Sequence, residues 1–406
     1  MTIWILALVL FVCLGYVGFA MGAIRVACTL VGLLFGALLA FPLGHLLNPI
    51  LKLVGLQNPF QLYLVGPLII FLLILIAFKI TGFLVHQKVD VYYKYKAGDL
   101  RMGLWNRLNA RLGLCLGLAN GAVYLILISL VVYIFSYPTL QIANGDNVGG
   151  LTKALNLMGR HVHGSGMAKV VAGIDPMPDT YYKATDIVGL IYHNDLLEAR
   201  LSRYPAFLTL GERPEFQDIA NDKEFTELRQ RLPAFAEIIN HPKAQAIVNN
   251  PALLQEIWAV AVPNFNDLET FLKTGKSAQY DSQAILGRWT IDLNGALSVL
   301  KKTKPNMVSV DMQRLKRVLV ASFGKTTLVA APDKQIIIKN FGTVKPATKP
   351  NTPPTVDYQT LQGQWAEDGG KYQLTIQGRP ALEAVVEGDK LTISGDALPM
   401  RFDREF

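Results

Sequence analysis

The sequence predicts an all-α four-helix membrane bundle followed by a soluble α+β region, in which a helical bundle precedes a small antiparallel β meander or barrel. Three observations support this fold class. Four long apolar runs fill residues 1–138, amphipathic helical spacing continues to about residue 285, and the apolar pattern then changes to a period of two. At 406 residues the chain is long enough for more than one domain.

Charge is distributed unevenly between these regions. Residues 1–138 carry nine basic and two acidic side chains, whereas the rest of the chain carries 30 basic and 29 acidic ones. The net charge of +8 therefore belongs mainly to the apolar third. Because the soluble part has no basic excess, we expect no nucleic-acid partner.

The four apolar runs have the length of membrane-spanning helices. Thr2–Met21 contains no charge, and 20 helical residues match a hydrocarbon core of ~30 Å. The other runs are Val26–Leu47, Tyr63–Val85 and Leu112–Tyr137. A cleaved signal peptide is the alternative for the first run, but no Lys or Arg precedes it and its apolar core is long. The lipid bilayer is thus an expected partner.

Loop charges predict the orientation. Arg25 follows the first run, and residues 86–111 carry six basic against two acidic side chains. On the opposite side, Lys52 and the distant Lys153 are the basic residues nearest the runs. The positive-inside rule places the basic turns in the cytoplasm. Both termini, together with the soluble region, are then expected outside the cytoplasm.

Small residues recur at intervals of four within the apolar runs, which lets helix backbones approach closely. These helix-packing candidates are Gly18, Gly22, Gly32, Gly36, Gly113, Gly117 and Gly121. The pattern predicts a compact bundle or self-association. Asn120, inside the last run, can form a hydrogen bond to a neighbouring helix.

None of the four runs contains Asp or Glu. Coupled proton and cation pathways generally use such groups, so a coupled transporter is disfavoured. A passive channel remains an alternative.

Two motifs carry a family resemblance. Gly22-Ala23-Ile24-Arg25 forms a G-x-x-R turn after the first run, and the glycine-studded Gly113–Gly121 segment follows a loop that contains Arg107. On these motifs, residues 1–138 resemble the colicin V production protein (CvpA) family. Val26 and Asn120 depart from the Gly and Arg that are frequent in the family at the corresponding places.

The resemblance implies a multi-pass protein of the bacterial inner (plasma) membrane, associated with colicin V (toxin) production and envelope function. It brings no established chemistry. Its motif residues here are Gly22, Arg25, Arg107 and Asn120. Under this resemblance, the two termini and the exported region are periplasmic.

The soluble part is expected to begin with a glycine-rich linker over 139–165, followed by a helical domain over 166–285. Asn240-His241-Pro242 and Asn249-Asn250-Pro251 are typical helix starts. They resemble the Asn-Pro repeats of chaperone adaptors, so a peptide-binding groove is an alternative to a plain helical bundle.

The last third is expected to contain strands. We predict a strand–helix–strand segment over 286–342 with its helix at Met307–Phe323, a Pro-rich linker over 343–356 and a β-meander over 357–406. Gly287-Arg288-Trp289 and Gly363-Gln364-Trp365 give these strands a lipocalin-like appearance. A lipid-holding cavity is the alternative to a filled core.

No catalytic constellation, nucleotide loop or HExxH motif is present in the sequence. His161 and His163 share one side of an extended segment, but no third zinc ligand is near, so we expect no metal site and no cofactor. The leading interpretation is a non-enzymatic membrane protein whose exported domain binds envelope proteins or self-associates. The alternative is a passive channel or a lipid-handling protein.

Overall fold

The computed structural model describes residues 2–56, 59–96, 99–143, 149–231, 233–303, 309–345, 355–394 and 400–405. The chain divides into two compact units, which are described separately. The first contains residues 1–189 and 228–252, and the second contains residues 190–227 and 253–406.

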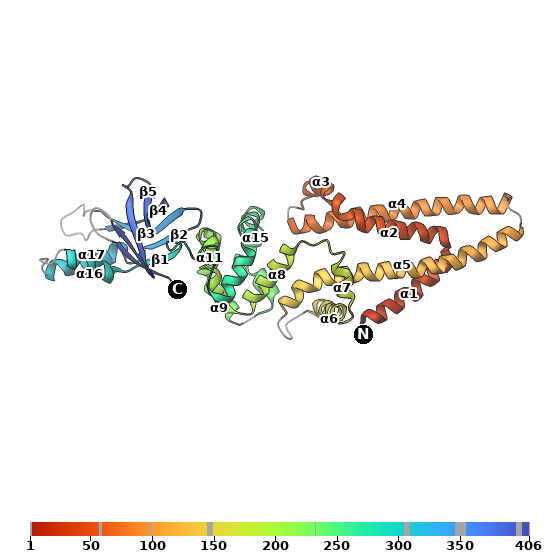
Figure 1. The fold of residues 1–406 in the computed structure, drawn as a ribbon, viewed down its shortest axis with the longest axis horizontal. Coiled ribbons are helices and arrows are strands. Elements are labelled where there is room, and N and C mark those ends of the chain that lie inside the picture. Colours follow the sequence, from red (N-terminus) through yellow and green to blue (C-terminus); the bar gives the residue numbers. More distant parts are fainter. Residues whose placement is uncertain are drawn as a thin grey trace. The chain divides into compact units, whose positions relative to one another are not determined.

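Four long helices form the core of the first unit (Figure 1). They are α1 (Thr2–Met21), α2 (Ala23–Gly44), α4 (Pro59–Lys96) and α5 (Asp99–Gln141). Each is long and apolar enough to cross a membrane, which confirms the four predicted helices. Helix α2 packs along α4, and α1 packs along α5. Between α2 and α4 lie the short helices η1 (His45–Leu47) and α3 (Asn48–Leu53).

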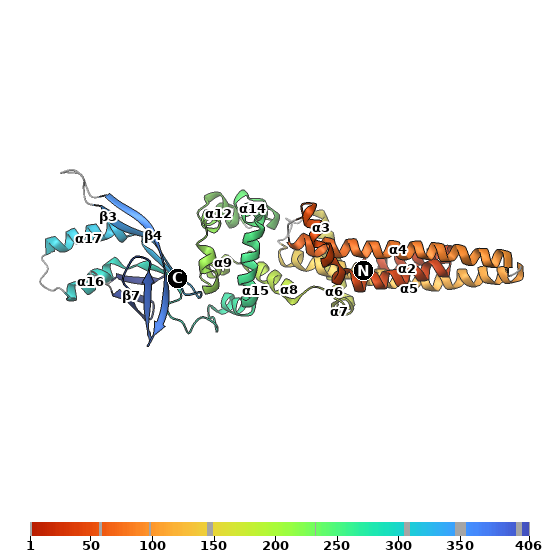
Figure 2. The same cartoon turned by 90° about the horizontal axis from the view of Figure 1, so that it is seen from above.

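Helices α4 and α5 extend well past the turn between α1 and α2 (Figures 1 and 2). With 38 and 43 residues, their lengths are ~57 and ~65 Å at a rise of ~1.5 Å per residue, about twice the thickness of the hydrocarbon core. The expected turn over 86–111 is therefore wrong, because α4 continues to Lys96 and α5 begins at Asp99. We call residues 83–108 of this helical pair the cationic arm.

A helix also replaces most of the expected linker over 139–165. Helix α5 continues to Gln141, and α6 (Gly150–Gly164) and α7 (Met167–Ala172) follow. Val162 and Val171 are buried with Ile3 and Leu125 of the long helices. Gly159 has a packing role, since a Cβ there would lie 2.3 Å from Oγ of Ser136. Gly159 therefore permits close packing of α6 on α5.

The helical region continues with short elements. In chain order these are α8 (Asp179–Tyr192), α9 (Asp195–Leu201), η2 (Pro205–Phe207), α10 (Leu208–Gly211), α11 (Pro214–Ala220), α12 (Lys223–Gln230), α13 (Phe235–Asn240), α14 (Pro242–Val248) and α15 (Pro251–Thr274). Two of the expected helix starts are present at Pro242 and Pro251. At the first of them the cap is not Asn240, which ends α13. Instead, the side chain of His241 accepts from the backbone N–H of Lys243.

The second unit contains a closed barrel of eight antiparallel strands in chain order. They are β1 (Gly287–Ile291), β2 (Thr327–Ala330), β3 (Gln335–Lys345), β4 (Thr355–Asp368), β5 (Lys371–Ile376), β6 (Leu382–Glu387), β7 (Lys390–Ser394) and β8 (Met400–Arg404). Strand β1 pairs with β8, with Trp289 opposite Arg404, and this pairing closes the barrel. Of the two arrangements that the sequence predicts, an open meander and a barrel, the structure has the barrel.

The expected division at 286–342, 343–356 and 357–406 does not separate domains, because strands from both sides of it belong to this one barrel. Strand β3 runs beyond the predicted end of this segment at residue 342. Asn340 has a φ of 52° and lies at a register shift between Ile338 and Phe341. The bulge lets the strand continue to Lys345. Residues 346–354 of the expected Pro-rich linker lie outside the described residues.

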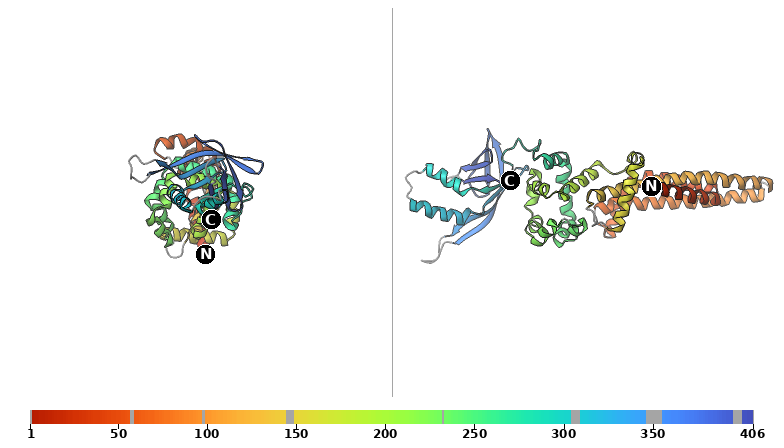
Figure 3. Two further views of the ribbon diagram at one scale, coloured as in Figure 1. Left: turned by 90° about the vertical axis from the view of Figure 1, so that its left-hand side faces the viewer. Right: turned by 90° about the horizontal axis from the view of Figure 1, so that it is seen from below.

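Two helices, not one, connect β1 to β2. They are α16 (Leu293–Thr303) and α17 (Ser309–Phe323). Asp292 starts α16, since its Oδ1 accepts from the backbone N–H of Gly295 at 2.8 Å. The right panel of Figure 3 shows both helices in cyan beside the blue strands. Phe323 packs against the barrel core, with its ring centre 4.9 Å from that of Phe341.

Aromatic and aliphatic side chains fill the barrel. Trp289, Trp365, Leu374 and Phe402 are each at most 3% exposed, and they belong to one buried cluster. An eight-stranded barrel has an interior that side chains can just fill. Such a barrel is also the architecture of lipocalins, which agrees loosely with the Gly-x-Trp starts.

Helices of the second unit are fixed to the barrel wall. Leu208 of α10 is fully buried against β2 and β3. Next to it, the carboxylate of Glu212 pairs with Nη2 of Arg288 at 2.7 Å and with the ammonium of Lys339. The Glu212 side chain is only 6% exposed. An ion pair this buried needs both partners, because a lone buried charge is costly.

Candidate functional site

The turn between α1 and α2 is unusually tight and is held by a side chain from α5. Gly22 alone separates the two helices, and its φ of 83° favours glycine. A Cβ at this position would lie 2.3 Å from Nδ2 of Asn109. Oδ1 of Asn109 accepts from the backbone N–H of Ala23 at 2.7 Å. Asn109 therefore supplies the N-cap for α2 that Gly22 cannot supply.

Arg25 lies in the first turn of α2. Its guanidinium carbon is 5.1 Å from the centre of the Phe83 ring on α4, which is a cation–π contact. Its Nε is buried and has no hydrogen-bond partner. The positive side chain thus lies at the positive end of the α2 dipole.

His86 of α4 lies beside the same helix end. One turn earlier, Gly82 is in contact with Cys28 and with the backbone of Arg25, so this face of α4 is turned toward α2. His86 is only 9% exposed, and its Nε2 lies 3.1 Å from the Asp90 carboxylate. Its Nδ1 is buried without a partner.

Trp105 of α5 lies one helical turn from Asn109, farther along the cationic arm. Its ring stacks on that of Tyr93 from α4, with centres 4.8 Å apart and planes inclined by 3°. The stack joins the two helices of the arm. The indole Nε1 is buried without a partner.

Gly22, Arg25, His86, Trp105 and Asn109 together are called the N-terminal niche. Three of its nitrogens are buried and unpartnered, and leaving such a group unsatisfied costs about 1–3 kcal/mol. The 20 residues of α1 span ~30 Å, so its end at Met21 lies near a membrane–water boundary. Arg25 therefore places a positive charge near this boundary, beside the turn between α1 and α2.

The family-motif residues are distributed around this niche. Gly22 and Arg25 belong to it. Asn120 is 4% exposed, and its Nδ2 donates to the carbonyl of Val26 in α2 at 3.3 Å. Arg107 is exposed on the cationic arm. Three of the four residues thus fix or line the start of α2, and Arg107 does not.

The predicted packing glycines lie at helix contacts. A Cβ on Gly18 would be 2.2 Å from the carbonyl oxygen of Gly113, and one on Gly117 would be 2.2 Å from that of Leu14. Gly121 lies against Phe11. On the other pair, Gly32 lies against Phe78 and Gly36 against Phe71 of α4. The backbones of α1 and α5 therefore approach closely, as the GxxxG spacing suggests.

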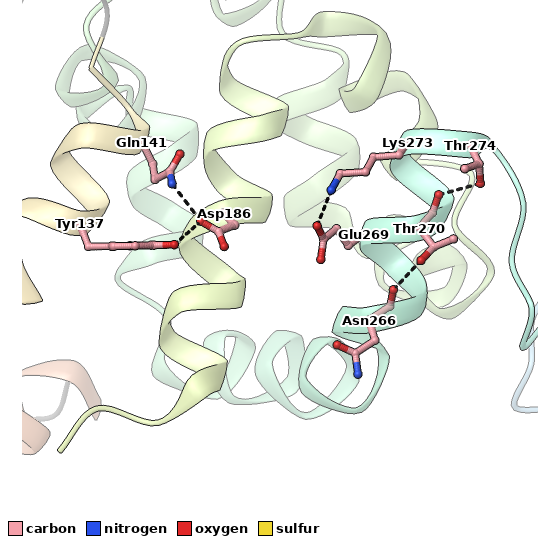
Figure 4. Close-up of polar contacts among 8 residues, drawn as sticks. All are labelled: Tyr137, Gln141, Asp186, Asn266, Glu269, Thr270, Lys273 and Thr274. Atoms are coloured by element: carbon pink, nitrogen blue, oxygen red, sulfur yellow. Dashed lines mark hydrogen bonds and ion pairs between the residues drawn. The ribbon is translucent and has the colours of Figure 1, made fainter. Parts of the chain in front are cut away.

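A second polar cluster lies at the other end of the bundle and fixes α8 to it. Figure 4 shows Tyr137 and Gln141 of α5 pointing toward Asp186, whose Oδ1 accepts from them at 2.8 and 3.0 Å. The hydroxyl of Tyr181 donates to the carbonyl of Ile134 at 2.9 Å. Burial, together with the charge of Asp175, raises the pKa of Tyr181 to about 12. These contacts have the character of a structural clamp.

The histidine pair does not form a joint site. His161 and His163 lie on helix α6, not on an extended segment, so positions two apart are about 200° apart around the axis. Nδ1 of His163 is 3.0 Å from the carbonyl of Gly159, and its ring stacks on Tyr133. Among the described residues, no group of three metal-ligating side chains occurs.

Sequence reasoning missed His86, Trp105 and Asn109. His86 and Trp105 fall within residues 86–111, which the loop charges indicate as a turn. One usable signal was present, because Asn109 lies one helical turn before Gly113, the first glycine of the α5 stripe.

Comparison with known proteins supports the family resemblance. The family model described as Colicin V production protein matches residues 4–156, which include the four long helices and the start of α6. No curated protein and no solved structure matches the chain. The helical region and the barrel beyond residue 156 thus lie outside the match.

Proposed function

We propose that this chain is a non-enzymatic inner-membrane protein that serves in colicin V (toxin) production or envelope function. In this proposal the four-helix bundle anchors the second unit outside the cytoplasm, where its outer surface binds envelope proteins or a second copy. The toxin role rests on the family match of residues 4–156.

The observation that carries the interaction role is the filled barrel. Its interior is occupied by buried side chains such as Trp289, Trp365 and Phe402. An interior occupied by side chains favours recognition through the outer surface over a ligand held inside. The buried Glu212 supports the same idea, because it makes helix α10 and the barrel wall one rigid surface.

Loop charge supports the orientation. The cationic arm carries five basic side chains, Lys88, Lys94, Lys96, Arg101 and Arg107, and the turn at its base adds Arg25. By the positive-inside rule this end faces the cytoplasm, and α5 then leads the chain to the periplasmic side.

A complementation assay tests the toxin role. The full chain is expressed in a colicin V-producing strain from which its own family member has been deleted. We expect restored toxin secretion, measured as inhibition of a sensitive lawn. Unrestored secretion, with the chain present in the inner membrane at normal level, would contradict this role.

Cross-linking tests the interaction role. A membrane-impermeant cross-linker applied to cells with a permeabilised outer membrane should join the full chain to an envelope protein or to itself in discrete adducts. A variant whose barrel is unfolded, such as Trp289→Asp, should lose these adducts. Identical adducts from both proteins would count against the second unit as the binding surface.

A further inference from the structure

We propose that an open edge of strand β4 pairs with the same edge of a second copy of this chain, which joins two barrels through one continuous antiparallel sheet. The inference rests on the interaction role proposed above and names a second copy as the partner. It is independent of the toxin role.

Strand β4 extends beyond one of its two neighbours. Strand β3 pairs with it as far as Thr355, whereas β5 pairs with it only from Gly363 to Asp368. Figure 2 shows β3 and β4 continuing past the other strands beside α17. Among the described residues, no strand pairs with the second edge of β4 over 356–361. We call this stretch the open edge.

The backbone hydrogen bonds on either side of β4 show which residues face the open edge. The N–H of Trp365 donates to the carbonyl of Lys334, next to β3, at 2.9 Å. The carbonyl of Gln362 accepts from the N–H of Gln377, next to β5, at 3.3 Å. The bulge adds its extra residue to β3, so β4 keeps its alternation. Even-numbered residues of β4 therefore direct their backbone groups away from β3.

Val356, Tyr358 and Thr360 thus present their N–H and carbonyl groups to the open edge. Tyr358 and Thr360 are exposed, and no hydrogen bond joins these edge groups to the part of the chain that the structure describes. A row of such groups is a template for another extended strand. Pairing of this kind is a recurrent mode of recognition between proteins.

The sequence of the open edge favours a second copy as that strand. In an antiparallel pairing centred on Tyr358, this residue lies opposite its own copy and Val356 lies opposite Thr360. All the edge-facing residues then face one another, and their pairs can exchange about six backbone hydrogen bonds. Between them Asp357 lies opposite Gln359, so no like charges are opposed. The open edge is therefore self-complementary, as a two-fold dimer requires.

Disulfide cross-linking of the purified full chain tests this register. The natural cysteines Cys13, Cys28 and Cys115 are replaced by alanine, and the Tyr358→Cys variant is oxidised with copper phenanthroline in detergent. The two copies of position 358 should have Cα atoms about 5.5 Å apart, which is within the span of a disulfide. We expect a covalent dimer on a non-reducing gel.

Val356→Cys is the matched control on the same face of the strand. Its two copies are offset by four residues, about 13 Å along the strand, which exceeds the span of a disulfide. The double variant Val356→Cys/Thr360→Cys restores an opposed pair and should again give a covalent dimer. Equal dimer yields from Tyr358→Cys and Val356→Cys, or no dimer from Tyr358→Cys, would overturn the proposal.

Thr360→Pro tests the backbone pairing itself. Proline removes an N–H that faces the open edge, and it should leave the pairing with β3 in place. Since each copy loses one bond across the interface, the dimer of the otherwise natural chain should weaken by about tenfold. Native mass spectrometry measures the dimer, and hydrogen exchange in β3 verifies the barrel. An undiminished dimer would overturn the proposal.

These outcomes are separable from those of the proposed function. The purified chain contains no envelope protein, so a missing disulfide removes only the second copy as partner. Discrete adducts with an envelope protein in cells would then still support the interaction role.

Discussion

The guanidinium carbon of Arg404 lies 4.4 Å from the centre of the Trp289 ring, so the last strand of the barrel is clamped on the first. The same guanidinium donates to the carbonyls of Leu286 at 2.8 Å and Ala284 at 2.6 Å. Burial lowers the pKa of Arg404, and the nearby charge of Asp389 opposes that effect. One side chain thus joins β8, β1 and the segment that enters the barrel.

Replacing this side chain should open the barrel seam. Arg404→Met removes two hydrogen bonds and a desolvated cation–π contact, which together contribute about 2–4 kcal/mol. Hydrogen exchange of the full chain should then show faster exchange in β1 and β8. The control is Arg379→Met, because Arg379 lies 4.4 Å from the Phe341 ring but is exposed and should cost less than ~1 kcal/mol. Equal effects of the two changes would contradict the role of Arg404 in joining β8 to β1.

Loss of Glu212 should release the helices from the barrel. Glu212→Gln leaves Arg288 and Lys339 without their buried anion, which we expect to cost about 2–4 kcal/mol. Limited proteolysis should cut the α9–α11 region faster than in the natural sequence. The comparison variant is Glu269→Gln, whose pair with Lys273 is an exposed helix pair contributing ~0.5 kcal/mol (Figure 4). If both variants resist proteolysis equally, Glu212 does not hold this interface.

Close approach of α1 and α5 should make Gly113 intolerant of any side chain. In Gly113→Ala the new Cβ would lie 2.2 Å from the carbonyl oxygen of Gly18, so the helices must separate and we expect a loss of several kcal/mol. Gly103 of α5 is the control, because a Cβ there meets nothing within 4 Å. Gly103→Ala should stabilise by about 0.5–1 kcal/mol through helix propensity. Melting of the detergent-solubilised chain measures both, and a stable Gly113→Ala variant would refute the packing account.

Much of this architecture follows from local pattern. The four apolar runs predicted α1, α2, α4 and α5, since only a membrane or a very large core accommodates such lengths. The period of two that predicts strands in the last third is seen in β5, where Tyr372, Leu374 and Ile376 are all at most 5% exposed.

The differences have physical causes that lie beyond local pattern. Charges and tyrosines over 86–111 suggested a loop, but i, i+4 contacts such as His86–Asp90 and the Tyr93–Trp105 stack support helices there. Glycine suggested a linker near Gly159, where close packing on Ser136 requires it. The niche depends on side chains from three helices that are distant in sequence, so spacing alone could not assemble it.

High pH should loosen the clamp between α8 and α5. Tyr181 has a pKa of about 10 in the unfolded chain and about 12 in the folded one. Its contribution to the free energy of unfolding is therefore complete below pH 10 and is lost as pH rises toward 12. The size is about 1 kcal/mol once partial solvent exposure is allowed for. Tyr181→Phe removes this group, so the stability difference between natural chain and variant should shrink between pH 9 and pH 12. A difference that is constant over this range would contradict the assignment.

Membrane topology is the most direct test of the central claim that the bundle holds the second unit outside the cytoplasm. Alkaline phosphatase, active only after export, and a green fluorescent protein that folds only in the cytoplasm are fused separately after Phe406 of the full chain. The account predicts high phosphatase activity and no fluorescence. Bright fluorescence without phosphatase activity would place the barrel in the cytoplasm and contradict the claim.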